Sequence, residues 1–299
     1  MARILLLFRL LDDYIGPLAA GHQVVHEPDD RVDVLLTTSM NGAPPELLDR
    51  LPGLRLLICF GSGYEGIDLD DARRRGLRVV NGAGTNYESV ADMTFGLLLA
   101  AGRRIVEGDR YIRAGQWGQA PRPGIVPAVH GARLGILGLG QVGIAIAQRA
   151  KGFAMQIAYH NTRPRDVPYE YVNSAMALAE WADFLVVALR ADDKSRHLVN
   201  ESFLRALGPT GVLVNISRGS VVDEDALARA LTEGWIRGAA LDVFAEEPPR
   251  NAALLAAPNT VLTPHIAAFT TRAIEDAMKL AAGNIAAFET GQPLLTPVL

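Results

Sequence analysis

Short apolar runs alternate with segments of helix-forming and charged residues along almost the whole chain. Runs of four to eight apolar residues separated by helices are typical of βαβ units, whose parallel strands are buried on both faces. The pattern therefore predicts an α/β fold with parallel sheets. The expected strands of the first part are Ile4–Phe8, Val32–Thr37, Leu54–Phe60 and Leu77–Val80, and those of the second are Leu134–Leu137, Gln156–His160, Phe184–Leu189, Val212–Ile216, Ala239–Val243 and Val261–Thr263.

Three further segments indicate how the sheets are connected. Tyr87–Val106 is expected to form one long, mostly buried helix, and the Gly/Pro-rich Gly115–Gly131 is expected to be a linker or exposed loop. Thr271–Thr290 is expected to form a helix that no strand of its own precedes. We therefore predict two doubly wound parallel-sheet domains, a Rossmann-type domain inserted into a flavodoxin-like one. The expected bounds are 96–269 for the inserted domain, and 1–95 with 270–299 for the other.

Composition and charge exclude several classes of protein. With 49% hydrophobic residues, the chain of 299 residues is too apolar to be disordered. A net charge of -4 gives no general attraction for nucleic acid or anionic lipid, so neither partner is expected. The single Cys59 cannot form an internal disulfide, and the apolar run Ile4–Phe8 is too short for a signal or a membrane span. We expect a soluble cytoplasmic protein. The histidines show no HExxH pattern, so no metal site is expected.

A glycine-rich turn lies between the first strand of the second set and the helix expected to follow. Gly138, Gly140 and Gly143 form the pattern GxGxxG in the sequence GLGQVG. In a dinucleotide-binding turn the first glycine permits a tight bend and the second lets the backbone approach a pyrophosphate. The third lets the helix pack closely on the strand. The motif predicts a dinucleotide site that includes Gln141 and Val142; the alternative is a purely structural turn.

The end of the next strand predicts which dinucleotide is preferred. NAD sites usually place an acidic residue about 20 residues beyond the fingerprint to bind the ribose hydroxyls. This chain has Asn161, Thr162 and Arg163 there, and no carboxylate before Asp166. An acid would repel a 2′-phosphate, whereas Asn and Thr donate hydrogen bonds and Arg163 offers a planar cationic fork. We therefore predict a preference for NADPH, with NADH also able to bind; the alternative is that Arg163 is a solvated loop charge.

An arginine, a carboxylate and a histidine follow three consecutive strands of the inserted domain: Arg218, Glu247 and His265. Consecutive parallel strands deliver such residues to the same carboxyl edge, where open α/β sheets bind ligands. Each residue alone has an ordinary structural interpretation, as a helix-start charge, a loop acid and a strand-end histidine. Together, at one ligand-binding edge, they indicate catalysis.

With these residues identified, the sequence resembles the D-isomer-specific 2-hydroxyacid dehydrogenase family over nearly its whole length. The segments that carry the resemblance are GLGQVG, NISRGSVVDEDAL, GAALDVFAEEPP and TPHIAAFT, in this order. The resemblance implies that Arg218 binds the carboxylate and carbonyl of the substrate, that His265 donates the proton and that Glu247 is its partner. A neighbouring carboxylate favours a charged imidazole, and fixed donors on Arg218 would polarise a carbonyl.

Further contacts are implied by the same resemblance. Phe60–Asp68, with the sequence FGSGYEGID, is similar to the family's substrate loop, in which the backbone amides of Ser62 and Gly63 would hold the substrate carboxylate. Tyr64 would lie over the substrate or pack the loop; the alternative for the whole segment is a plain strand-to-helix turn. Additional cofactor contacts are expected at Thr94, Ala188, Leu189, Ile216, Ser217, Asp242 and Ala267.

Some positions depart from the family pattern. Arg190 stands where the family usually carries proline, which leaves its cofactor contact open. Cys59 stands where phosphoglycerate dehydrogenases carry an arginine, so a phosphorylated substrate would lack one expected cation. The resemblance implies a homodimer formed through the Gly/Pro-rich arm, where Trp117 is either a dimer anchor or an internal packing residue.

These features predict an oxidoreductase that reduces small 2-keto acids, above all glyoxylate and hydroxypyruvate, to D-2-hydroxy acids. Hydride transfer from NADPH would be coupled to proton donation by His265. One alternative is a reductase of 2-ketogluconate or of aromatic 2-keto acids. Another is a dinucleotide-sensing binding protein, similar to the family-related corepressors.

Overall fold

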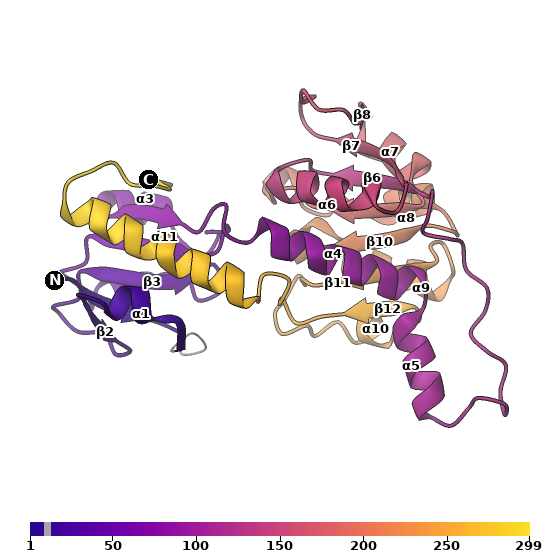
Figure 1. Ribbon diagram of the computed structural model, residues 1–299, viewed down its shortest axis with the longest axis horizontal. Helices are drawn as coiled ribbons and strands as arrows, with labels where there is room; N and C mark the ends of the chain where they lie inside the picture. The colour runs from indigo at the N-terminus through magenta and orange to yellow at the C-terminus, as the bar shows by residue number, and fades with distance from the viewer. Residues whose placement is uncertain (9–12) are drawn as a thin grey trace. The chain divides into compact units, whose positions relative to one another are not determined.

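The computed structural model describes residues 1–8 and 13–299, and the chain divides into two compact units (Figure 1). The first unit comprises Met1–Asn86 and Ala268–Leu299, and the second comprises Tyr87–Ala267. Each unit has its own parallel sheet, one with five strands and one with seven. The predicted fold class, a doubly wound parallel-sheet unit inserted into another, is therefore confirmed.

The sheet of the first unit has the strand order β2-β1-β3-β4-β5, and all of its pairs are parallel. Its strands are β1 (Arg3–Leu6), β2 (Gln23–Val25), β3 (Val34–Thr38), β4 (Leu56–Phe60) and β5 (Arg78–Asn81). This is the flavodoxin-like order. The four expected strands are present. The sequence pattern missed β2, which has three residues and an exposed or half-buried face.

Helices cover both faces of this first sheet. They are α1 (Gly16–Ala19), α2 (Pro45–Leu48), α3 (Leu69–Arg74) and α11 (Thr271–Glu289). One apolar core joins the strands to α1 and α11, and the other joins them to α2 and α3. As expected, α11 follows no strand of its own, and the Thr270 side chain accepts a hydrogen bond from Ala273 N at its start.

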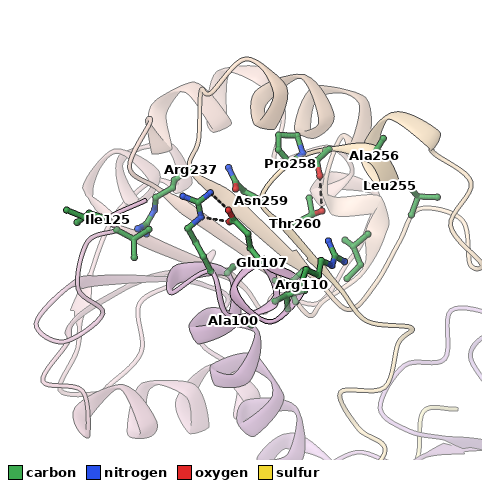
Figure 2. Close-up of a pocket in the computed structure, with 17 residues that line it drawn as sticks. Ala100, Glu107, Arg110, Ile125, Arg237, Leu255, Ala256, Pro258, Asn259 and Thr260 are labelled. Atoms are coloured by element: carbon green, nitrogen blue, oxygen red, sulfur yellow. Dashed lines mark hydrogen bonds and ion pairs between the residues drawn. The ribbon is translucent and has the colours of Figure 1, made fainter. Parts of the chain in front are cut away.

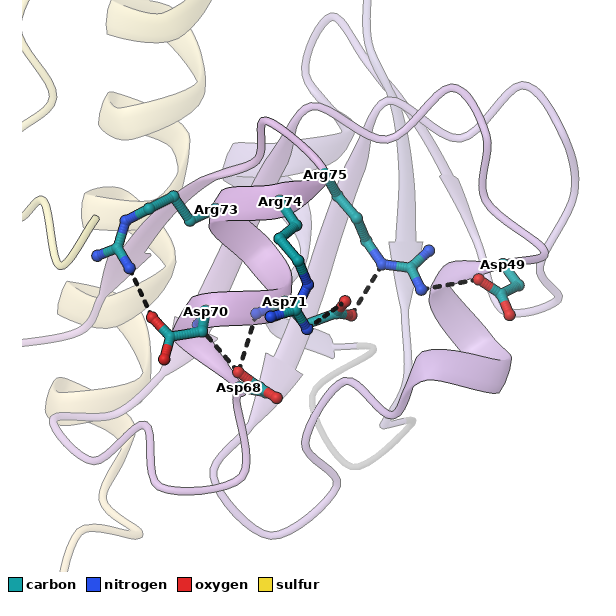
Figure 3. A network of polar contacts seen from close by, with 7 residues as sticks. All are labelled: Asp49, Asp68, Asp70, Asp71, Arg73, Arg74 and Arg75. Atoms are coloured by element: carbon teal, nitrogen blue, oxygen red, sulfur yellow. Dashed lines mark hydrogen bonds and ion pairs between the residues drawn. The ribbon is translucent and has the colours of Figure 1, made fainter.

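A network of charged side chains fixes α3, the helix that follows the loop Phe60–Asp68 (Figure 3). The Asp68 carboxylate caps the helix by accepting from the backbone amides of Asp70 and Asp71, both at 2.9 Å. Arg75 binds both Asp71 and Asp49 at 2.8 Å. The hydrogen bond from Arg75 outweighs desolvation and holds the pKa of Asp71 below its usual range. The C-terminal end of the loop is thereby anchored.

The sheet of the second unit has the strand order β12-β11-β10-β9-β6-β7-β8, again entirely parallel. Its strands are β6 (Arg133–Leu137), β7 (Gln156–His160), β8 (Glu170–Tyr171), β9 (Phe184–Val187), β10 (Val212–Asn215), β11 (Gly238–Leu241) and β12 (Thr260–Leu262). The six expected strands are present, and β8 is an additional edge strand of only two residues. The order reverses at β6, which places a topological switch point beside the glycine turn.

Two helices, α4 (Tyr87–Gly102) and α6 (Gln141–Lys151), contribute to the core on one face of this sheet. On the other face lie α7 (Ala175–Trp181), α8 (Glu201–Leu207), α9 (Glu224–Thr232) and α10 (Ala252–Ala256). The remaining short helices are η2 (Asp193–Ser195) and η3 (Gly219–Val221). Because α4 packs along its length on α6 and the sheet, all of it belongs to the second unit. The expected boundary between residues 95 and 96 lies inside this helix, and the expected boundary between 269 and 270 lies two residues after Ala267.

The expectation of one helix over Tyr87–Val106 is corrected by the structure. The chain forms α4 and a separate α5 (Ile105–Arg113), with Arg104 between them in a left-handed conformation at φ 55°. Gly102 ends α4 against the second sheet, where a Cβ would lie 2.8 Å from the Phe184 ring. The left-handed Arg104 breaks the helical path, and hydrophobic periodicity does not reveal this position.

Across residues 1–8 and 13–299, none of the helices combines the length and the apolar character that crossing a bilayer requires.

Candidate active site

The glycine turn between β6 and α6 uses each glycine differently. Gly138 has φ 102°, and a Cβ there would lie 2.3 Å from the backbone nitrogen of Leu189. A Cβ on Gly143 would lie 2.4 Å from the Gly138 carbonyl oxygen. Both positions are therefore closed to side chains by the packing of the protein itself. A Cβ on Gly140 would meet nothing within 4 Å, so this glycine borders open space.

That open space lies at the N-terminus of α6, where the chain presents free backbone donors. Gly140 is the N-cap residue, and no side chain caps this helix end. The first amides of a helix have no intrahelical acceptor, and the helix dipole adds a partial positive charge there. Gln141 and Val142 lie in this first turn. The combination of room and donors fits the pyrophosphate of a dinucleotide.

The residues after β7 lie beside the same turn. The Asn161 side chain accepts a hydrogen bond from Leu139 N at 2.7 Å, and the Arg165 guanidinium donates to Leu139 O at 2.6 Å. Thr162 and Arg163 are exposed. The sequence pattern missed Arg165, whose backbone nitrogen and oxygen are both bound by the hydroxyl of the buried Tyr159. Two residues of the segment therefore brace the glycine turn, and Arg163 remains open to solvent.

The loop after β9 joins the glycine turn to the end of β10. Ala188 and Leu189 form the backbone against which Gly138 packs. The Ser217 hydroxyl donates to Leu189 O at 2.5 Å, and Ile216 N donates to Val187 O at 3.3 Å. These expected cofactor residues therefore cluster at the carboxyl edge, where a ligand of an open α/β sheet binds.

Thr94 lies apart from this cluster of backbone contacts. It is fully buried in α4, and its hydroxyl donates to Val90 O of the preceding turn at 2.7 Å. A threonine hydroxyl used in this way satisfies its donor within the helix.

The predicted histidine and glutamate form a pair. His265 Nδ1 lies 2.7 Å from Glu247 Oε2, and the other carboxylate oxygen accepts from Phe244 N at 3.0 Å. Burial raises the pKa of Glu247, but the hydrogen bonds from His265 and Phe244 N and the charge of Arg218 lower it by more. The net pKa of this carboxyl is therefore below its ordinary value of 4.5. An ionised Glu247 places the proton on Nδ1, so Nε2 is the atom available for exchange with a substrate.

A buried carboxylate builds the turn that carries His265. Asp242 is 1% exposed, and its Oδ1 accepts from Thr263 Oγ1 at 2.6 Å and from Ile266 N at 2.9 Å. Its Oδ2 accepts from Ala267 N at 2.9 Å. His265 lies within this turn at φ 53°, a left-handed conformation that is uncommon for residues other than glycine. Asp242 and Ala267 are both expected from the sequence to bind cofactor. The described hydrogen bonds of the Asp242 side chain are with Ala267 and with other residues of this turn.

Arg218 is held at the end of β10 by its own backbone neighbourhood. Its guanidinium donates to Ser217 O at 2.7 Å, and its carbonyl accepts from the Asn215 side chain at 3.0 Å. A Cβ on Gly219 would lie 1.8 Å from the Phe244 carbonyl carbon, so the Arg218 turn packs directly on the backbone after β11. This close approach brings the arginine within electrostatic range of Glu247. The second unit thus gathers Arg218, Glu247 and His265.

The predicted substrate loop belongs to the first unit, between β4 and α3. Ser62 is exposed, and Gly63 is half-buried. Tyr64 is partly buried and packs against the core that includes Cys59 and Ile67.

Comparisons with known proteins agree with this geometry. Residues 95–267 match the family model described as "D-isomer specific 2-hydroxyacid dehydrogenase, NAD binding domain". A glyoxylate reductase of Thermococcus litoralis is 39% identical over 286 residues, which cover 92% of this chain and 86% of the relative. The chain belongs to the D-isomer-specific 2-hydroxyacid dehydrogenase family. The family predicted from four sequence segments is confirmed, and with it an oxidoreductase that binds a nicotinamide dinucleotide.

Other members of the family are similar over most of the chain. A glyoxylate/hydroxypyruvate reductase of Arabidopsis thaliana is 42% identical over 259 residues, covering 86% of this chain and 82% of the relative. The structure of an NADPH-dependent glyoxylate/hydroxypyruvate reductase from Sinorhizobium meliloti, in complex with NADP and malonate, is 34% identical. It superposes with a TM-score of 0.90 and covers 99% of this chain and 96% of the other. The fold that carries the glycine turn and the histidine pair is therefore shared across these enzymes.

Replacing the partner of His265 tests the electrostatic role of the pair. In Glu247→Gln, we expect kcat to fall by about 10²-fold, because an amide can hold the ring but supplies no negative charge to an imidazolium. Steady-state kinetics measure this effect. The matched control is Glu246→Gln, whose exposed carboxylate pairs with Arg250 at 3.0 Å and lies outside the pair. Equal losses in the two variants would contradict the assigned role.

The same variant gives a pH-dependent difference in stability. A carboxyl whose pKa is lowered on folding stabilises the protein above its unfolded pKa, and this stabilisation is lost as the pH falls through the folded pKa. The free energy of unfolding of the unmodified protein should therefore exceed that of Glu247→Gln at neutral pH. The difference should shrink below the ordinary value of 4.5. Urea unfolding at several pH values measures it; a difference that grows on acidification would contradict the direction of the shift.

Proposed function

We propose that this enzyme reduces small 2-keto acids, above all glyoxylate and hydroxypyruvate, to D-2-hydroxy acids, with NADPH as the preferred cofactor. The observation that carries the proposal is the His265–Glu247 pair at 2.7 Å, which leaves Nε2 available for proton donation. The relatives named as glyoxylate or glyoxylate/hydroxypyruvate reductases support the substrate class.

The roles of the residues follow from the charge that develops during reduction. A bound nicotinamide dinucleotide supplies the hydride to the carbonyl carbon of the substrate. Arg218 neutralises the substrate carboxylate and polarises the carbonyl with fixed donors. His265, as the imidazolium, gives its Nε2 proton to the carbonyl oxygen as negative charge develops there. Glu247 stabilises that imidazolium through Nδ1. For the Ser62–Gly63 loop of the first unit, the family resemblance supports a role of the backbone amides in binding a substrate carboxylate.

Replacement of the proton donor tests the mechanism. We expect His265→Ala to lower kcat by about 10²- to 10⁴-fold, the usual contribution of general acid catalysis. NADPH affinity, measured by fluorescence titration, should be nearly unchanged because the glycine turn is intact. The control is His130→Ala, an exposed histidine outside the site.

The substrate assignment is tested with a panel of glyoxylate, hydroxypyruvate, pyruvate, 2-ketogluconate and phenylpyruvate. Glyoxylate or hydroxypyruvate should give the highest kcat/KM. A higher value for 2-ketogluconate or phenylpyruvate would replace the proposed substrate. Tight NADPH binding with no turnover of any acid would favour a sensing protein instead.

The preference for NADPH has its support in the segment after β7. No carboxylate stands at residues 161–163, where it would repel a 2′-phosphate. Arg163 is exposed, and Asn161 and Arg165 fix the backbone on either side of it through Leu139. The NADPH-dependent relative from Sinorhizobium meliloti agrees with this choice.

The cofactor proposal is tested by comparing kcat/KM for NADPH and NADH. Arg163→Ala should lower the value for NADPH by roughly tenfold or more, because a charge-assisted hydrogen bond is lost, and should leave NADH nearly unchanged. Arg250→Ala is the control, since Arg250 is an exposed surface cation of the same unit. A clear preference of the unmodified enzyme for NADH would overturn the assignment.

We also propose that a second copy of the chain covers a hollow in the second unit (Figure 2). The hollow has a volume of about 700 Å³ and is lined by α4, α5, residues 125–126, Arg237 and residues 255–262. The three guanidinium nitrogens of Arg237 are buried without a hydrogen-bond partner among the described residues, and burial lowers the pKa of this group. A buried, unpaired cation is costly unless another chain supplies oxygen acceptors.

The surface around the hollow has the properties of a self-complementary interface. Exposed apolar side chains protrude from α5 and from the arm that follows it: Ile105, Ile112, Trp117 and Ile125. The helix α5 supplies both exposed apolar side chains and part of the wall of the hollow. A twofold axis can therefore place the apolar side chains of each copy against the wall of the other copy. A group of exposed apolar side chains beside a hollow is typical of an interface.

Sedimentation equilibrium tests this assembly. The unmodified protein should have twice the chain mass of 32.1 kDa. The double variant Ile112→Lys/Ile125→Lys should be monomeric at the same concentration, because it introduces uncompensated charges into an apolar contact. Met40→Lys, at an exposed apolar residue of the first unit, is the control and should remain dimeric. A monomeric unmodified protein would contradict the proposal.

A further inference from the structure

Two side chains fix the peptide groups of the loop that contains Ser62 and Gly63. The Asn81 side chain donates from Nδ2 to Ser62 O at 2.8 Å. The buried Cys59 thiol donates to Gly63 O at 2.9 Å. In a trans peptide the carbonyl and the following N–H point in opposite directions. Asn81 therefore holds the Gly63 N–H pointing away from itself, and Cys59 does the same for the next amide. Of the two amides proposed to bind the substrate carboxylate, Gly63 N–H thus has its direction set by Asn81, whereas Cys59 orients Tyr64 N–H. The direction of Ser62 N–H is set by a backbone contact, since Gly82 N donates to Gly61 O at 2.7 Å.

Asn81 ends β5 and is itself held by a segment far away in the sequence. Its backbone carbonyl accepts from the Thr296 hydroxyl at 2.6 Å, and its backbone nitrogen donates to Thr296 O at 3.2 Å. The neighbouring Val80 forms an antiparallel bridge with Pro297. Residues 296–299 therefore line the edge of β5 as an added, irregular strand.

The Thr296 hydroxyl is oriented in turn by a buried amide on α11. Asn284 is fully buried, and its Nδ2 donates to Thr296 Oγ1 at 3.2 Å and to Leu280 O at 3.0 Å. Its Oδ1 accepts from Leu295 N at 2.9 Å and from Thr296 N at 3.4 Å. Because Thr296 Oγ1 accepts from Asn284, its own proton is directed to Asn81.

The burial of the Asn284 side-chain amide in an apolar helix face requires a physical explanation. Asn284 lies beside Ile285, one turn from Ala281 and two from Met278, in the helix face that packs on the first sheet. Burying an amide costs free energy unless its hydrogen bonds are made, and an apolar side chain would avoid that cost. Three of the four described side-chain hydrogen bonds of Asn284 join it to Leu295 and Thr296. The amide thus ties the segment after α11 in one register against β5.

We propose that Asn284, Thr296 and Asn81 form a positioning relay that sets the direction of the Gly63 amide, one of the two amides proposed to bind the substrate carboxylate. Asn81 contacts the loop at Ser62 O, and Thr296 and Asn284 act on the loop through Asn81. The relay thereby affects the affinity for the 2-keto acid. This inference rests on the proposed function, because it takes the Ser62–Gly63 amides as the site of the substrate carboxylate. It adds that residues 295–297, which bind no substrate themselves, help to determine KM.

The test uses Thr296→Val, which keeps the shape of the side chain and removes both hydrogen bonds of the hydroxyl. We expect KM for the preferred 2-keto acid to rise roughly tenfold, with a smaller change in kcat, because the oriented Gly63 donor is loosened. The Kd of oxamate, an unreactive keto-acid isostere, should rise by a similar factor when titrated calorimetrically onto the NADPH complex. The Kd of NADPH should not change. Thr296→Ser, which keeps the hydroxyl, should restore KM and the affinity for oxamate.

A matched control separates this role from a general loss of stability. Thr290→Val removes a hydroxyl that donates to Ala286 O at 2.8 Å at the end of α11, away from the relay, and should leave KM unchanged. If Thr296→Val lowers kcat in proportion to the folded fraction and leaves KM and the oxamate Kd unchanged, the relay is overturned and the proposed function stands. If the unmodified enzyme reduces no 2-keto acid, the proposed function fails, and with it the relay.

Discussion

The reacting residues of the second unit depend on the buried carboxylate of Asp242. Its two oxygens accept hydrogen bonds from Thr263, Ile266 and Ala267, and these bonds hold the turn in which His265 takes its left-handed conformation. Such a conformation persists only where the surroundings determine it. Because the ring direction follows from the backbone, the 2.7 Å contact with Glu247 depends on Asp242 as well. One buried group thus fixes the orientation of His265, the proposed proton donor, at the end of a strand.

Close backbone packing builds the rest of this edge of the sheet. Gly138 lies against Leu189, and Gly219 lies against Phe244, at separations that no Cβ could occupy. These approaches draw together the loops after β6, β9, β10 and β11, which carry the expected cofactor residues and Arg218. Gly140 has the opposite role, since it borders open space at the uncapped N-terminus of α6. In the first unit, hydrogen bonds from Asn81 and Cys59 give a comparable order to the loop after β4.

The sequence pattern predicted ten strands, the glycine turn and the family, because each depends on local composition and on motifs whose chemistry constrains their spacing. It missed β2 and β8, which have three and two residues and are recognised only by their pairing with a neighbouring strand. It joined α4 and α5 into one helix, because the break lies in the left-handed backbone conformation of Arg104, which the apolar pattern does not reveal. It overlooked Arg165, since nothing in the sequence ties that side chain to the carbonyl of Leu139.

The sequence by itself determined the α/β architecture, the nicotinamide dinucleotide cofactor and the residue types that carry the chemistry. Periodicity, glycine spacing and strand-end position are local properties, and they can be recognised in the sequence without knowledge of the packing. Only the tertiary structure decided that Asp242 organises the His265 turn, that Arg165 braces the glycine turn and that Asn284 reaches Asn81 through Thr296. Each of these contacts joins residues far apart in the chain, and a hydrogen bond depends on distances that only the folded backbone sets.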